Sequence, residues 1–131
     1  MVNLGHKAVL IVDDVEEMRN LLATVLMHYG FNNIFHAQNG DRAMEIAANF
    51  EIDLAFLDIN MPGLDGLEVL RELKSRNEQI FTVMVSGAGT LDNVRKAKRY
   101  GANAFLVKPC RAGKIDEVVQ KYAHILQGQS K

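Results

Sequence analysis

Five short apolar runs, each followed by a stretch of helical periodicity, are the feature that most restricts the fold of this chain. The runs occupy residues 8–12, 34–37, 54–57, 81–85 and 104–107. Apolar residues repeat at spacings of three and four, typical of one buried helix face, over 18–29, 43–50, 67–73, 91–97 and 115–126. Consecutive strands joined by helices need crossover connections. The sequence therefore predicts an α/β fold with a largely parallel five-stranded sheet and five helices covering both faces.

The length of 131 residues predicts a single domain over 1–131, because two domains would have about 65 residues each. We expect a core over about 7–127 and a polar, frayed tail. The composition, 48% hydrophobic and 24% charged, excludes extended disorder. The apolar runs are far shorter than the roughly 20 residues that span a bilayer, and the N-terminus does not resemble a secretory signal. With a lone cysteine, Cys110, the chain is expected in the cytoplasm.

Charge is divided unevenly along the chain, although the net charge is only -1. Residues 1–65 contain 3 basic and 10 acidic residues, whereas residues 66–131 contain 12 and 6. This division indicates acids gathered in a pocket and a basic surface formed by the second half. Overall the composition is not typical of nucleic-acid binding, so we expect no direct contact with nucleic acid or membrane.

Reactive side chains follow four of the five predicted strands. The first strand runs into Asp13 and Asp14, the third into Asp58, the fourth into Ser86 and the fifth into Lys108. Ligands of open α/β sheets bind beyond the carboxyl ends of the strands. If the second strand lies at an edge, the other four strand ends converge on one cleft.

Three carboxylates about 5 Å apart would repel one another by roughly 3 kcal/mol per pair at an effective dielectric constant near 20. Either one carboxyl group stays protonated or a hard divalent cation binds. Mg²⁺ suits a site of oxygen ligands. Zinc is disfavoured, because no histidine or cysteine stands beside the acids in the sequence. The Ser86 hydroxyl and the Lys108 ammonium would add a donor and a positive charge. Together these groups predict a site for a phosphoryl group carried on one of the carboxylates.

These motifs in combination resemble the receiver domain of two-component response regulators. They are the Asp-Asp pair, the stretch LDINMPGLDG at 57–66, a serine followed by small residues, and a Lys-Pro pair. The resemblance covers essentially the whole chain. It implies a flavodoxin-like, doubly wound fold with strand order 2-1-3-4-5, of the single-domain, chemotaxis-like type.

The resemblance also implies roles for individual residues around a bound Mg²⁺. Asp58 corresponds to the phosphoacceptor and Asp14 to a direct metal ligand. Asp13 would act mainly through metal-bound water, and the backbone carbonyl of Asn60 would complete the protein ligands. The side chains of Asn60 and Ala88 would influence the lifetime of the phosphoryl group.

Further roles concern signal transmission. Ser86 would bind a phosphoryl oxygen and change position, Lys108 would pair with the phosphoryl group, and Phe105 occupies the position of an aromatic switch. The resemblance implies a cis peptide bond before Pro109. The phosphoryl group would come from a sensor histidine kinase or a phosphotransfer protein.

The expected output surface comprises the fourth helix, the fifth strand and the fifth helix. Arg95, Lys98 and Arg99 are spaced to share one side of the fourth helix. They indicate an acidic or amphipathic downstream partner, although a solvated basic face would have the same pattern.

Other interpretations of the same residues remain open. An Asp-Asp pair is often a helix cap with a solvated acid, and Cys110 is interpreted as an idle thiol. A dehalogenase-type aspartyl phosphatase needs an acid two residues after its nucleophile, where this chain has Asn60. We therefore expect a switch and no enzyme beyond self-directed phosphorylation and dephosphorylation. A free-standing receiver is favoured, and a fragment of a transcription factor or hybrid kinase is the alternative.

Overall fold

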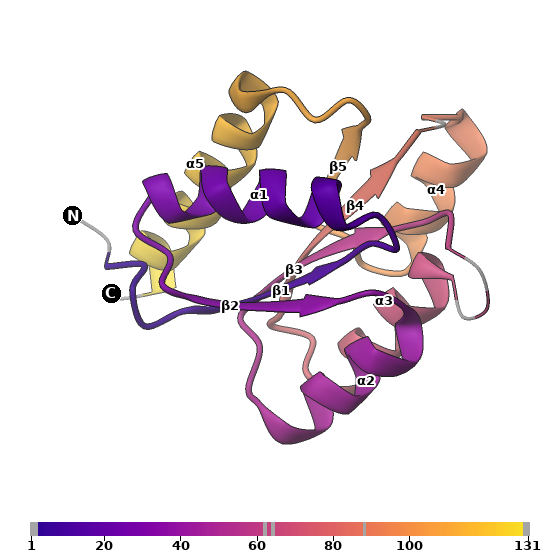
Figure 1. Ribbon diagram of the computed structural model, residues 1–131, viewed down its shortest axis with the longest axis horizontal. Helices are drawn as coiled ribbons and strands as arrows, with labels where there is room; N and C mark the ends of the chain where they lie inside the picture. The colour runs from indigo at the N-terminus through magenta and orange to yellow at the C-terminus, as the bar shows by residue number, and fades with distance from the viewer. Residues whose placement is uncertain (1–2, 62, 64, 88, 130–131) are drawn as a thin grey trace.

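Five parallel strands in the order β2-β1-β3-β4-β5 form the central sheet of the computed structural model, which describes residues 3–61, 63, 65–87 and 89–129 (Figure 1). The strands are β1 (Ala8–Val12), β2 (Asn33–Ala37), β3 (Leu54–Asp58), β4 (Phe81–Ser86) and β5 (Ala104–Val107). The helices are α1 (Glu16–His28), α2 (Gly40–Asn49), α3 (Gly66–Arg76), α4 (Leu91–Arg99) and α5 (Ala112–Gln129). The fold class, the elements and the strand order are confirmed.

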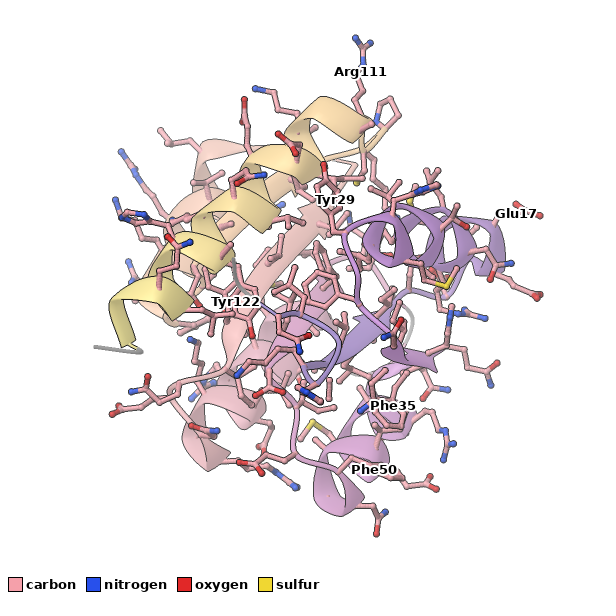
Figure 2. The ribbon with its side chains drawn as sticks, turned by 90° about the vertical axis from the view of Figure 1, so that its left-hand side faces the viewer. Glu17, Tyr29, Phe35, Phe50, Arg111 and Tyr122 are labelled. Carbon is pink, nitrogen blue, oxygen red and sulfur yellow. The ribbon has the colours of Figure 1, made fainter. Side chains whose placement is uncertain are left out.

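Alternate residues of the strands enter two separate apolar cores, because successive side chains point to opposite faces of a sheet. On β1, Val9 and Ile11 belong to the core beneath α1 and α5, together with Tyr122 of α5, which is labelled in Figure 2. Leu10 and Val12 belong to the core on the other face, with residues of α2, α3 and α4. Figure 1 shows α1 and α5 on one side of the sheet and α2 and α3 on the other. Burial on both faces explains why β1, β3 and β4 are nearly continuous apolar runs.

Local signals set several helix ends. Asp65 caps α3 by accepting a hydrogen bond of 3.0 Å from the N–H of Glu68. Gly30, with φ of 100°, follows Tyr29, the C-cap residue of α1, at a position where the left-handed conformation favours glycine. At the C-terminus, α5 continues to Gln129, past the limit of about residue 127 that we expect for the core. Partly buried Ile125 and Leu126 pack against the core near this end of the helix. Among the helices of the described residues, none is long and apolar enough to cross a membrane.

Core packing provides a matched test of this arrangement. Leu70 on α3 is fully buried, whereas Leu91 at the start of α4 is 63% exposed. We expect L70A to lower the free energy of unfolding by about 2–5 kcal/mol, because it removes apolar contacts and leaves a cavity. The L91A control should change it by no more than about 0.5 kcal/mol. Urea unfolding of both variants measures the difference, and equal effects would contradict the assigned core.

Candidate functional site

The sheet register brings the four reactive strand ends to one edge. Asp58, the last residue of β3, pairs with Val85 on β4, and Ser86 pairs with Val107 on β5. Asp13 follows the end of β1, where its N–H donates to the carbonyl oxygen of Ala37 at the end of β2 (3.1 Å). The edge position of β2 leaves the remaining strands adjacent, so the predicted convergence is present.

Lys108 joins the two buried carboxylates of this edge. Its Nζ lies 3.0 Å from Oδ2 of Asp13 and 3.3 Å from Oδ2 of Asp58. Asp13 and Asp58 are only 1% and 2% exposed. Buried charges are strongly destabilising unless they are paired. Lys108, which is itself partly exposed, supplies that pairing to both carboxylates.

The pKa values follow from burial and charge. Burial raises the pKa of Asp58, and the negative charge of Asp13 raises it further, while Lys108 and the N–H of Asn60 offset part of the increase. Burial alone would lower the pKa of Lys108, but its contacts with the two carboxylates outweigh burial and raise it. The site therefore has excess negative charge that one lysine does not fully neutralise.

A metal ion would balance this charge, and the donor set fits Mg²⁺. One oxygen from each of Asp13, Asp14 and Asp58 lies within 4.8 Å of the others. Within the described part of the chain, the buried Oδ2 of Asp13 accepts no hydrogen bond, although it has the ionic contact with Lys108. An oxygen-only cluster with one exposed member, Asp14, leaves room for the waters that Mg²⁺ retains.

The loop after β3 places polar groups beside Asp58. The N–H of Asn60 donates to Oδ1 of Asp58 (3.2 Å). The side-chain amide of Asn60 donates to Oγ of Ser86 (3.3 Å), a contact that the sequence did not predict. A Cβ on Gly66 would lie 2.0 Å from the carbonyl oxygen of Asp58, so this tight return of the chain requires glycine. Ala88, to which we assigned an influence on phosphoryl lifetime, lies outside the described residues.

Strand β5 connects the cleft to a neighbouring surface. The Lys108–Pro109 peptide bond is cis, as the resemblance implies. Phe105 is partly buried and pairs in register with Met84, two residues before Ser86. Phe105 also borders a cavity of about 160 Å³ between α4 and β5, which Lys98 helps to line. Phe105 thus lies between the cleft and α4.

The remaining predicted residues lie away from the carboxylates. Arg95, Lys98 and Arg99 are exposed on α4. Cys110 is buried in the core, and burial raises the pKa of its thiol, in agreement with an idle cysteine. The interpretation of the Asp-Asp pair as a helix cap is wrong, since the capping position of α1 is Val15.

Comparison with known proteins decides the family. The sequence profile of the response regulator receiver domain matches residues 9–120. The chain belongs to this family. The receiver domain is 36% identical to the chemotaxis protein CheY of Bacillus subtilis over 90% of its length and 98% of that protein. It is 35% identical to the sporulation initiation phosphotransferase F of the same organism, covering 89% and 94% of the two chains.

Structural comparison confirms the fold of the receiver domain. A CheY-like receiver domain protein from Methanospirillum hungatei superposes with a TM-score of 0.86 at 24% identity, covering 94% of this chain and 98% of that one. Receiver domains are signalling switches that phosphorylation activates, and their acidic pockets generally bind Mg²⁺. The cluster of Asp13, Asp14 and Asp58 is the acidic pocket of this one.

One residue at the receiver site escaped sequence analysis. Arg19 of α1 donates a hydrogen bond of 2.6 Å from Nη1 to the backbone carbonyl of Asp13. No motif indicates this contact, because a single arginine on an amphipathic helix is ordinarily a solvated residue. The only hint in the sequence is that Arg19 lies six residues after Asp13. This spacing does not by itself predict a contact, because the contact depends on the path of the loop between the two residues.

The raised pKa of Asp58 predicts a pH-dependent effect of substitution in Mg²⁺-free protein. A carboxyl group whose pKa rises on folding costs stability as the pH increases from its ordinary value through the raised one. D58N lacks this charge, so its free energy of unfolding should exceed that of the wild type at pH 7, by a margin that shrinks toward pH 4. Urea unfolding in EDTA measures the margin, with D65N as a control. A less stable D58N at pH 7 would contradict this electrostatic account.

Proposed function

We propose that this receiver domain accepts a phosphoryl group on Asp58 from the phosphohistidine of a sensor histidine kinase or phosphotransfer protein. The observation that carries the proposal is the pairing of buried Asp58 with Lys108, beside two further aspartates. An oxygen of the Asp58 carboxylate attacks phosphorus, and the bond from phosphorus to the imidazole nitrogen breaks with its electron pair on the imidazole. The product is an acyl phosphate.

Four residues would hold Mg²⁺ in this reaction. They are Asp14 as a direct ligand, Asp13 mainly through water, the carboxylate of Asp58 and the backbone carbonyl of Asn60. When bound, Mg²⁺ supplies positive charge to the phosphoryl oxygens. Lys108 already lies 3.3 Å from Asp58 and would stabilise the same charge from the β5 side of the cleft.

Ser86 and Phe105 would transmit phosphorylation to the surface. The Ser86 hydroxyl would leave its hydrogen bond with Asn60 and bind a phosphoryl oxygen. The space that it vacates would let the ring of Phe105 turn inward, altering the surface of α4, β5 and α5. Phenylalanine has no hydroxyl, so ring packing alone would favour one orientation. A partner senses the change only if it binds the two states with different affinity.

The partner at this surface would be acidic or amphipathic, since Arg95, Lys98 and Arg99 are exposed on α4. The chemistry is self-directed: the domain catalyses its own phosphorylation and the later hydrolysis of the acyl phosphate. Asn60 and Ala88 would influence the rate of hydrolysis. A lone, buried cysteine suits the reducing environment of the cytoplasm, where we place this exchange.

Phosphorylation by a small donor tests the assignment of Asp58. With Mg²⁺ and acetyl phosphate, the wild type should gain one phosphoryl group, measured as intact mass, and EDTA should abolish the gain. D58N should gain none, because it lacks the nucleophile. The matched control, D65N, keeps a capping side chain at α3 and should be phosphorylated like the wild type. Undiminished phosphorylation of D58N would refute the proposal.

Amide NMR spectra test the proposed transmission. Addition of beryllofluoride and Mg²⁺ should shift the signals of Phe105 and of α4, including Arg95, Lys98 and Arg99, as well as those of the cleft. The same additions to D58N should leave α4 unchanged. Shifts confined to the strand ends would exclude this route even if Asp58 is the phosphoacceptor.

A further inference from the structure

Asp13 is held by contacts on all of its polar groups. Its N–H donates to Ala37 on β2 (3.1 Å), its Oδ1 accepts from the N–H of Val15 (2.9 Å), and its Oδ2 faces Lys108 (3.0 Å). Its carbonyl oxygen accepts the 2.6 Å hydrogen bond from Arg19. A guanidinium donor makes this bond charge-assisted and therefore stronger than a neutral one. Arg19 thus controls the direction of the Asp13 carbonyl.

Peptide geometry extends this control to the next residue. The carbonyl of Asp13 and the nitrogen and Cα of Asp14 lie in one plane. A donor that fixes the carbonyl therefore also fixes the position of the Asp14 Cα. The hydrogen bond from the Val15 N–H to Oδ1 of Asp13 restrains the following peptide plane, and the two planes together set the direction in which the Asp14 side chain leaves. Asp14 is exposed, so packing restrains its carboxylate weakly, and repulsion from Asp13 and Asp58 favours its turning into solvent.

We propose that Arg19 is a positioning residue that keeps the Asp14 carboxylate within the metal-binding cluster by holding the carbonyl of Asp13. This inference rests on the proposed Mg²⁺ site and adds to it a residue that does not touch the metal. Groups that orient metal ligands commonly change metal affinity by about 10- to 100-fold when they are removed.

The partial burial of Arg19 supports a specific role. Its Nε is buried and, within the described part of the chain, makes no hydrogen bond. An arginine without such a role normally keeps its polar head in water, so the contact with Asp13 outweighs an unsatisfied donor. Burial and the nearby positive charge of Arg19 lower the pKa of His36 on β2.

The sign of the effect separates positioning from simple electrostatics. A positive charge near a divalent cation opposes its binding. If Arg19 acted through charge alone, R19M would bind Mg²⁺ more tightly than the wild type. If it positions Asp14, R19M should bind Mg²⁺ more weakly, by about tenfold.

A double-mutant cycle with Arg19 and Asp14 tests the proposal. Mg²⁺ dissociation constants are measured by NMR titration without any phosphodonor, with R42M as a control that removes a remote, exposed arginine of α2. R19M should weaken binding about tenfold in the wild-type background and less than about twofold in D14N, since its target is then absent. R42M should have no effect. Unchanged or tighter binding by R19M, or equal losses in both backgrounds, would overturn the proposal.

Hydrogen exchange of the Mg²⁺-free protein gives a second readout. Loss of the Arg19 contact should accelerate exchange of the Val15 amide, which donates to Asp13, and unchanged exchange would count against the proposal. If R19M does not fold, R19K enters the same measurements, because it keeps the charge but not the planar fork.

The two proposals fail separately. Full Mg²⁺ affinity in D14N would refute the metal site, whereas weakened binding by D14N together with unchanged binding by R19M would refute only the role of Arg19.

Discussion

Repulsion among three carboxylates is the interaction on which the rest of this receiver domain depends. Asp13, Asp14 and Asp58 bring their oxygens within 4.8 Å of one another, and two of the three residues are almost completely buried. Lys108 pairs with both buried members but leaves negative charge in excess. A site of this kind is costly to fold and is stabilised when a divalent cation or a phosphoryl group with its metal binds. The free-energy cost of this repulsion therefore makes the domain sensitive to binding of a cation or a phosphoryl group.

The scaffold holds these charges together against their repulsion. Parallel strands with β2 at the edge bring the ends of β1, β3, β4 and β5 side by side. Gly66 allows the chain to return closely past Asp58, and Asn60 donates to both Asp58 and Ser86. On the other side, Arg19 fixes the backbone between Asp13 and α1. Contacts from the loops after β1 and β3 therefore hold the members of the acidic cluster in place.

Sequence periodicity predicts the strands and helices well, because burial on both faces of β1, β3 and β4 leaves uninterrupted apolar runs. Strand order came from the family resemblance, since apolar spacing does not determine which strands are neighbours. The strand-end residues were predictable because their chemistry is unusual in combination. The contact of Arg19 with Asp13 and that of Asn60 with Ser86 depend on loop paths that no spacing encodes.

A crystal structure of the domain with Mg²⁺ and beryllofluoride would test the central claim most directly. The account predicts beryllofluoride attached to a carboxylate oxygen of Asp58, within reach of Lys108, with Mg²⁺ beside it and Asp14 among the metal ligands. It also predicts that the Ser86 hydroxyl has moved to the fluoride atoms. An unmodified Asp58, or a metal bound away from the three carboxylates, would contradict the account.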